Sequence, residues 1–409
     1  MLDVTESVRA LPSIRRSSAL RSDALISASI EEKFEDDDMA DYVARIGATG
    51  YLTFNAAYDA IETGAMTGTI VMLKDAGFSF PSRKDIHCQL SVNLNGHTLA
   101  NAGNTDFRPS TDSVVRIFDN SGLGTGAYVT STKQNALSIL NNAEVYLENI
   151  TLTANGTPVT CTSGTGVVSI KNCTVTSGSK YFAGVNIGGT TALTIEDSTI
   201  TGGPAVQLSS SFNGTACIDG SDLIGMYSAI LTIQASNADH PVVVKDSNLS
   251  VASGGNFAPG VYLQQNAKVV NLNNVVIDMV NNEKAEQYAI RMTSEGVSTI
   301  NVTDSEFKNV VGYGICMDMD GYGDANFYGT KITTTKQTVE MDHPNGHTHF
   351  YSGCNLITGQ SGIYYTANGS MTTLHQGVTL NVNPGESNYK FTVDGNVQDN
   401  GDGTWTIIE

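Results

Sequence analysis

The chain is poor in charged residues, and above all in cations. Charged residues make up 15% of its 409 residues, whereas an average soluble protein has about 25%. Only 22 Lys and Arg stand against 41 Asp and Glu, which gives a formal net charge of −19. A phosphate backbone or an anionic membrane surface would be repelled, so the composition argues against nucleic acid as a partner. Neutral glycans, cations and basic protein surfaces remain compatible with this charge.

Long hydrophobic runs and closely spaced cysteines are missing as well. No apolar run approaches about 18 residues, so the sequence predicts no membrane span. Residues 1–30 carry Arg and Ser but lack the continuous apolar block of a secretory signal. The six cysteines include no C-x-x-C pair, which argues against a zinc knuckle or a thioredoxin-type site. We expect most of these cysteines to be buried.

The main positive feature of the sequence is a pattern that repeats along the chain. It reads apolar, any, apolar, any, Asn/Asp/Gly, small, any, apolar, as in "VYLENITL", "VSIKNCTV" and "LTIEDSTI". Its fifth position recurs at intervals of 23 to 30 residues. We call these positions the markers: Asn149, Asn172, Asp197, Gly220, Asp246, Asn274, Asp304, Gly329, Gly353 and Gly377.

A self-similar period of this length is typical of a solenoid, in which each unit buries its apolar face on the next unit. Alternation with period two before the marker predicts a strand, and a second alternating piece ("GVNI", "AVQL", "GVYL") predicts another strand in each unit. At the marker, Asn, Asp or Gly tolerates the left-handed backbone of a sharp bend. Stacked about 4.8 Å apart, the Asn and Asp side chains can also bond one another in a ladder.

This pattern resembles the right-handed parallel β-helix of the pectate-lyase-like superfamily. The opening "ATGYLTFNAAYDAIETG", "TIVMLKD" and "LSVNLNGHTL" is similar to secreted and cell-surface β-helix proteins of gut bacteria. The resemblance implies an all-β solenoid of about ten coils over residues 65–380. We expect residues 1–30 to form a polar leader, residues 31–64 a capping segment with a short helix, and residues 381–409 a hairpin-like cap with "NGDG" as its turn.

The catalytic motifs that the resemblance would imply are missing. Pectate-lyase chemistry implies an R-x-P-x-x-R stretch, but the Arg108-Pro109 pair is followed by its next arginine only at Arg116. The polygalacturonase set of N-T-D, D-D, G-H-G and R-I-K is absent too.

The period itself predicts a candidate site, because residues one coil apart stack on each other. Aligning the second strands places one outward column at Tyr262, Arg291, Cys316, Glu340 and Tyr364. The next outward column contains Asp318 and Asp342. Three carboxylates therefore meet one arginine, while Tyr262 and Tyr364 could stack on sugar rings.

Acidic and histidine-rich loops follow this column. Asp318, Asp320 and Asp324 form D-x-D-G-x-G-D, whose oxygens can wrap Ca²⁺, although the Glu that an EF-hand loop needs at its twelfth position is missing. After Asp342 comes His343 in "HPNGHTH", so Asp318, Asp320, Asp324, Asp342 and His343 are candidate metal ligands. His349 falls where the repeat predicts an inward, core position.

Three interpretations of the patch remain open: a solvated acidic face, a metal site, and an acid–base pair of a glycosidase or lyase formed by Asp318, Glu340 and Asp342 with Arg291. Three functions follow. The first is an extracellular or cell-surface protein, adhesin-like or glycan-binding, whose partner is a glycan or a host-surface component. The second is a polysaccharide lyase or hydrolase, and the third is a phage tailspike or receptor-binding protein, for which the resemblance implies a trimer.

Overall fold

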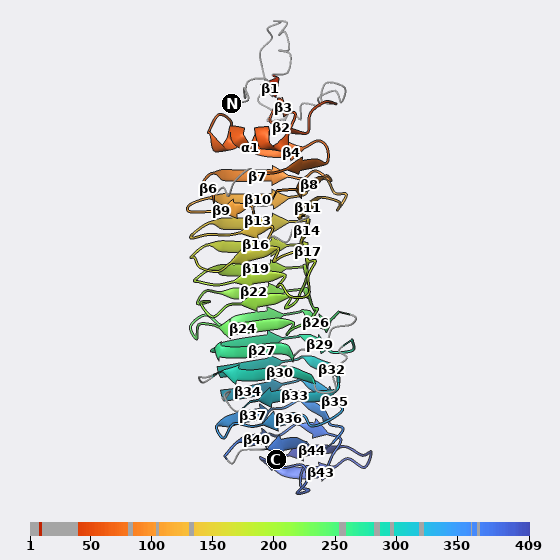
Figure 1. Cartoon of the computed structure of the whole chain (residues 1–409). Helices are drawn as coiled ribbons and strands as arrows, with labels where there is room; N and C mark the ends of the chain where they lie inside the picture. The colour runs from red at the N-terminus through yellow and green to blue at the C-terminus, as the bar shows by residue number, and fades with distance from the viewer. Residues whose placement is uncertain are drawn as a thin grey trace, which may run out of the picture.

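Each copy of the repeated pattern forms two strands with a bend at the marker, as predicted. Asn149 separates β13 (Glu144–Glu148) from β14 (Thr151–Ala154), and the next coils stack on them in parallel register. The result is an all-β solenoid of about 11 turns with a single helix in the described part of the chain (Figure 1). This computed structural model describes residues 8–9, 40–80, 85–103, 106–130, 135–252, 259–281, 287–294, 298–318, 323–360, 362–365 and 369–409.

The first parallel sheet contains the strand that precedes each marker. Its strands, in stacking order, are β4 (Thr69–Met72), β7 (Gln89–Asn93), β10 (Val114–Phe118), β13, β16 (Val167–Lys171), β19 (Ala192–Glu196), β22 (Ala216–Asp219), β25 (Val242–Lys245), β28 (Val269–Asn273), β31 (Ser298–Thr303), β34 (Gly323–Tyr328), β37 (Gly346–Phe350), β40 (Met371–Leu374) and β42 (Thr392–Val393).

The second parallel sheet contains the strand that follows each marker. Its strands are β5 (Ala76–Phe78), β8 (Thr98–Asn101), β11 (Ala127–Thr130), β14, β17 (Thr174–Ser177), β20 (Thr199–Gly202), β23 (Asp222–Gly225), β26 (Asn248–Val251), β29 (Val276–Asp278), β32 (Glu306–Val310), β35 (Lys331–Thr334), β38 (Asn355–Ile357) and β41 (Thr379–Leu380).

The third parallel sheet contains the second alternating piece of each unit. Its strands are β12 (Leu137–Ser138), β15 (Val159–Cys161), β18 (Val185–Ile187), β21 (Val206–Leu208), β24 (Leu231–Ala235), β27 (Pro259–Asn266), β30 (Gln287–Ser294), β33 (Gly312–Met317), β36 (Val339–Met341) and β39 (Ile363–Tyr365). Two further strands, β6 (Asp85–Ile86) and β9 (Arg108–Pro109), pair beside the first coils.

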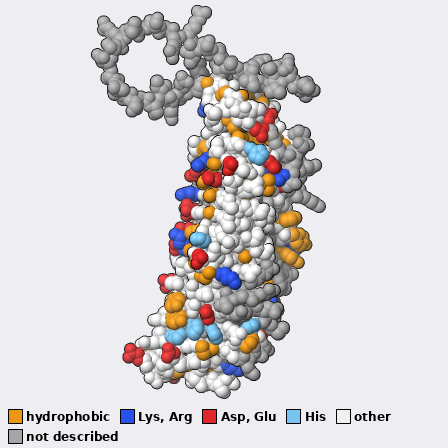
Figure 2. Space-filling view, turned by 90° about the vertical axis from the view of Figure 1, so that its left-hand side faces the viewer, with side chains coloured by type: hydrophobic (Ala, Val, Ile, Leu, Met, Phe, Trp, Pro, Cys, Tyr) orange, Lys and Arg blue, Asp and Glu red, His pale blue; other side chains and the backbone are white. Residues whose placement is uncertain are grey.

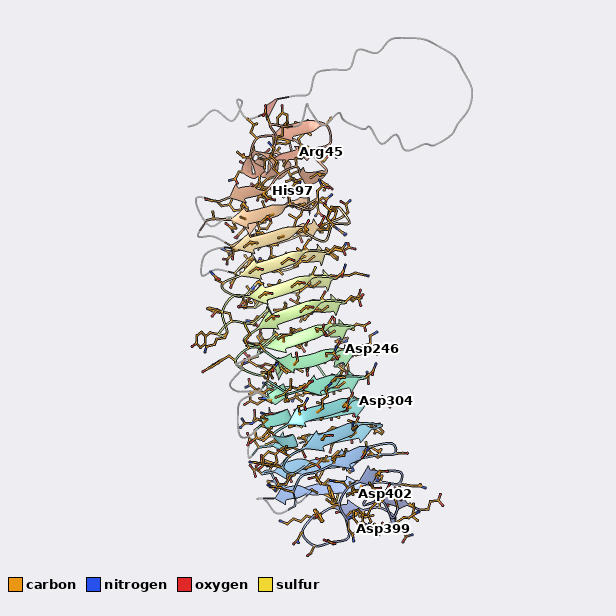
Figure 3. The ribbon with its side chains drawn as sticks, turned by 90° about the vertical axis from the view of Figure 1, so that its right-hand side faces the viewer. Arg45, His97, Asp246, Asp304, Asp399 and Asp402 are labelled. Carbon is orange, nitrogen blue, oxygen red and sulfur yellow. The ribbon has the colours of Figure 1, made fainter. Side chains whose placement is uncertain are left out.

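The markers have the left-handed backbone that the sequence predicts. All ten have positive φ, from 48° at Asp197 to 84° at Gly377. Asn172 donates its side-chain amide to Asn149 at 2.7 Å, and Asn274 donates to Asp246 at 2.6 Å, so the side-chain ladder is present as well. Asp246 and Asp304 lie along the same edge of the solenoid (Figure 3).

The core runs along the solenoid axis and is built from the inward residues of the three sheets. It contains the fully buried Phe307, Phe327 and Phe350 on successive coils. Phe327 stacks on Phe350 and meets Phe307 edge to face. Four of the six cysteines are buried, which confirms the expectation for most of them, and all six are free thiols.

The two ends of the solenoid have different covers. At the N-terminal end α1 (Phe54–Glu62) begins at Thr53, whose side chain accepts a hydrogen bond from the Ala56 amide, and its apolar face buries Phe54 and Tyr58. Beside it β2 (Ala44–Ile46) and β3 (Thr49–Tyr51) pair antiparallel, as do β3 and β1 (Val8–Arg9). At the C-terminal end β43 (Asn396–Asp399) and β44 (Trp405–Ile408) form an antiparallel hairpin on β41.

Candidate functional site

The outward column predicted on the third sheet is present. The strand register pairs Tyr262 with Arg291, Arg291 with Cys316, Cys316 with Glu340, and Glu340 with Tyr364. Only the backbone of Tyr364 belongs to the described part, so its predicted role in stacking on sugars stays a prediction. The regular period was sufficient to find these neighbours, because parallel coils stack residue on residue.

Arg291 is held by its neighbours within the column. Its Nε donates to Asp318 Oδ2 at 2.8 Å, and its Nη2 donates to the same oxygen. The guanidinium also lies over the rings of Tyr262 and Tyr288, 5.6 and 5.5 Å from their centroids. Bound on three sides in this way, the guanidinium keeps its positive charge and stabilises the stack of coils, so Arg291 does not serve as a base.

Glu340 lies next to a thiol that the sequence did not mark as buried. Cys316 points outward in register but is only 1% exposed, and burial raises the pKa of its thiol, as does the charge of Glu340. Burial likewise raises the pKa of the Glu340 carboxyl, while hydrogen bonds with Cys316 and Tyr288 oppose the rise. The charge of Asp342 adds to the rise. The patch is therefore half-buried and internally bonded.

The candidate metal ligands are divided between two sheets. Asp318 and Asp342 follow β33 and β36 on the third sheet, whereas Asp324 lies in β34 of the first sheet, where it meets His347 at 3.2 Å. His343 follows Asp342 and accepts a hydrogen bond from the Asn345 amide, and Asp320 lies outside the described residues. Within the described ranges, no three or more His, Cys, Asp and Glu side chains are grouped so as to hold a metal ion. The Ca²⁺ prediction thus gains no support from them.

His349 does not point into the core, contrary to the expectation from the repeat. In β37 the inward residues are Thr348 and Phe350, both fully buried, and His349 faces outward. Phe350 pairs in register with Phe327 of the preceding coil. Phe327 lies two residues before its marker Gly329, but Phe350 lies three residues before its marker Gly353. One extra residue in this coil therefore shifts the alternation, and counting back from Gly353 selects the wrong face.

The outward-facing histidines form a cluster on the first sheet. His349 Nδ1 lies 3.3 Å from His375 Nε2, and His375 Nδ1 lies 3.0 Å from Asp394. His347 lies on the other side of His349, with ring centroids 6.5 Å apart. Tyr351 stacks on His375 at 4.4 Å, and histidine side chains gather toward the C-terminal end of the face in Figure 2. Burial, and next the charge of His375, lower the pKa of His349.

This cluster predicts a loss of stability in mild acid. A histidine whose pKa is lowered by folding contributes stability that is complete above its unfolded pKa, near 6.5, and is lost as the pH falls. We expect the melting temperature to fall between pH 7 and pH 5, and to fall less in His349→Gln. Scanning calorimetry of both proteins across this range tests the expectation.

His240→Gln is the matched control, because His240 is exposed in the connection between β24 and β25 and does not contribute to the lowered pKa of His349. Its melting temperature should follow that of the wild type. An identical decline in His349→Gln and the wild type would contradict the assignment to His349.

A groove on the outer face of the first sheet is a site that the sequence did not reveal. One hollow of about 400 Å³ lies between the end of α1, residues 64–69 that follow it, and strands β7 and β10. A second hollow of about 300 Å³ adjoins it and is lined by Ser91, Arg116, Phe118, Tyr146 and Glu148. Arg116 lines both hollows, and its guanidinium lies 4.4 Å from the centroid of the Tyr146 ring. The sequence did contain one sign of this site, because Arg116 and Tyr146 occupy the same position in successive coils.

A cluster of exposed aromatic side chains was missed as well. Tyr181 and Phe182, between β17 and β18, are 68% and 44% exposed, and Tyr227, between β23 and β24, is 42% exposed. Hydrophobic side chains project from the middle of the solenoid at the edge of Figure 2. These residues lie in the connections between strands, where the repeated pattern makes no prediction.

Comparison with known proteins adds no relative to these observations. No protein family, curated protein or solved structure matches the chain. Across the described residues, no helix is both long and apolar enough to cross a membrane. The function of the chain is therefore inferred from its sites.

Proposed function

We propose that this chain is an extracellular or cell-surface β-solenoid that binds a glycan without converting it. The observation that carries the proposal is the groove on the first sheet, with Arg116 and Tyr146 on its floor. Two adjoining hollows over β7, β10 and β13 follow the solenoid axis, which suits a linear ligand. A concave site with a few converging polar groups is the usual form of a ligand site.

The chemistry of the groove fits a saccharide. Tyr146 offers an aromatic ring to the apolar face of a sugar, and its hydroxyl is oriented by donating to Glu144 at 2.7 Å. Gln89, Ser91 and Glu148 supply donors and acceptors for sugar hydroxyls. The net charge of −19 disfavours nucleic acid, which leaves a neutral glycan as the better partner.

The absence of turnover is supported by the candidate catalytic patch. Arg291 is bound by Asp318, and Glu340 is hydrogen-bonded to Cys316 and Tyr288. The sequence also lacks the lyase and polygalacturonase motifs. The charges and hydrogen bonds of this patch are thus taken up by its own side chains and not directed at a substrate.

Tyr146→Ala should weaken glycan binding about tenfold or more, since a lost ring contact costs about 1.4 kcal/mol. Arg116→Ala should weaken it similarly, because the guanidinium lines both hollows and packs on the Tyr146 ring. A glycan array with the wild type first identifies a ligand, and titration calorimetry then compares the variants. Thr194→Ala, in the same outward column two coils beyond Tyr146, is the matched control and should bind like the wild type. The proposal would be wrong if the wild type bound no glycan but released products from polysaccharides.

A second candidate function is a polysaccharide hydrolase, and the observation that favours it is Glu340. A carboxyl with a raised pKa near a second carboxylate, Asp342, is the pairing of a general acid with a base or nucleophile. If this function holds, Glu340→Gln and Asp342→Asn should each lower the turnover of neutral or acidic polysaccharides by a hundredfold or more. Equal rates in wild type and Asp342→Asn would remove the site.

A further inference from the structure

The exposed aromatic residues form one cluster although they come from coils that are not adjacent. Lys180, Tyr181 and Phe182 belong to the coil of β17 and β18, and Tyr227 belongs to the coil two further on. The Tyr181 and Tyr227 rings meet edge to face with centroids 5.3 Å apart. The rings can meet because the coil between them has only small residues, Gly203 and Pro204, at this place.

Backbone hydrogen bonds hold the cluster together in addition to the contact between its rings. The Gly203 amide donates to the Phe182 carbonyl at 2.6 Å, and the Tyr227 amide donates to the Gly203 carbonyl at 3.3 Å. A Cβ on Gly203 would lie 2.5 Å from the Lys180 carbonyl oxygen, so the glycine permits this approach. Rings that are ordered before a ligand arrives lose little conformational entropy on binding.

Lys180 sets this cluster apart from the rest of the acidic surface. Its ammonium lies 5.5 Å from the Tyr181 ring centroid and 5.1 Å from the Tyr227 ring centroid. No acidic side chain among the described residues forms an ion pair with it, whereas Lys171 of the same coil is paired with Glu196 at 3.3 Å. The ammonium is therefore positioned by the two rings. No carboxylate of the described residues neutralises it, so it can bind an anionic group of a ligand.

The size of the cluster favours a small ligand over a protein or a membrane. A fully buried aromatic side chain covers 150–250 Å², so three partly exposed rings offer roughly 300 Å². A stable protein interface needs about 800 Å² from each partner. An anionic membrane would be repelled by the net charge of −19. A membrane would face the acidic surface as a whole. A small anion would touch only Lys180 and its surroundings, and charges more than about 8 Å away are screened at physiological salt, so Lys180 determines the affinity for such an anion.

We propose that Lys180, Tyr181, Phe182 and Tyr227 form a second saccharide site, which takes a sugar carrying a carboxylate or sulfate group. The rings stack on the apolar face of the sugar, and the Lys180 ammonium binds its acidic group. This inference rests on the proposed glycan binding and adds to it an acidic ligand class at a place separate from the groove.

The test compares an acidic oligosaccharide with a neutral one of equal length, by titration calorimetry at physiological salt. Wild-type protein should bind the acidic ligand several-fold more tightly. Tyr181→Ala should weaken binding of both ligands about tenfold, and Lys180→Gln should remove the preference while keeping the affinity for the neutral one. Leu123→Ala is the matched control, because Leu123 is 72% exposed and lies far along the chain from the cluster. It should bind both ligands like the wild type.

Several results would overturn the inference. Unchanged affinities in Tyr181→Ala would do so, as would a wild-type preference for the neutral ligand. The wild type could instead bind vesicles of anionic phospholipid, or dimerise without saccharide. If Tyr181→Ala abolished either behaviour, the partner of the cluster would be a membrane or a second copy of the chain, and the saccharide site would be wrong. If glycan binding is lost only in Arg116→Ala and Tyr146→Ala, the proposed function stands and this second site falls. If no glycan binds at all, both fall.

Discussion

Phe327→Ala is expected to lower the free energy of unfolding by about 4 kcal/mol, within the range for removing a buried phenylalanine. Phe327 is fully buried in β34, where its ring lies 4.9 Å from Phe350 and 6.1 Å from Phe307. Each coil of a solenoid contacts only its neighbours, so the cavity weakens these coils first. Urea denaturation measures the total loss, and hydrogen exchange should show faster opening of β32, β34 and β37 than of β13.

Tyr328→Ala is the matched control for this cavity. Tyr328 is the next residue along β34, faces outward and is 40% exposed, and its ring stacks on Tyr351 at 4.5 Å. Loss of this surface stack should cost about 1 kcal/mol. Equal destabilisation in the two variants would contradict the assignment of stability to the buried phenylalanine contacts.

Asp304→Val is expected to cost about 2 kcal/mol of stability. Asp304 is a marker with φ of 49°, a left-handed backbone that a β-branched residue adopts only under strain. Asp304→Gly is the control, because glycine has this conformation without strain and already occupies the markers Gly329, Gly353 and Gly377. It should stay within about 0.5 kcal/mol of the wild type.

Thermal and urea unfolding of the two Asp304 variants provide the measurement. Both substitutions remove the carboxylate, so the difference in stability between the Val and Gly variants reports the cost of the left-handed backbone. If Asp304→Val and Asp304→Gly have the same stability, the left-handed backbone contributes nothing and the role of the marker lies in its side chain.

For the candidate site on the third sheet, the sequence predicted which residues stack on one another but not how far they are buried or which partners bind them. The period placed Arg291, Cys316 and Glu340 on one another, and the register confirms this. The burial of Cys316 and the binding of Arg291 by Asp318 depend on side-chain directions that no repeat specifies. The prediction for His349 was wrong for a different reason, because a single extra residue before Gly353 reversed the alternation.

The sequence by itself determined the coils, their parallel stacking and the left-handed markers. These features are local or periodic: Asn, Asp and Gly tolerate the bend, and alternating apolar residues select the buried face. Only the tertiary structure decided which connections meet. Tyr181 reaches Tyr227 across a coil with Gly203 and Pro204, and Arg116 lines a groove under the segment after α1. Such contacts join residues of irregular spacing, so no pattern in the sequence encodes them.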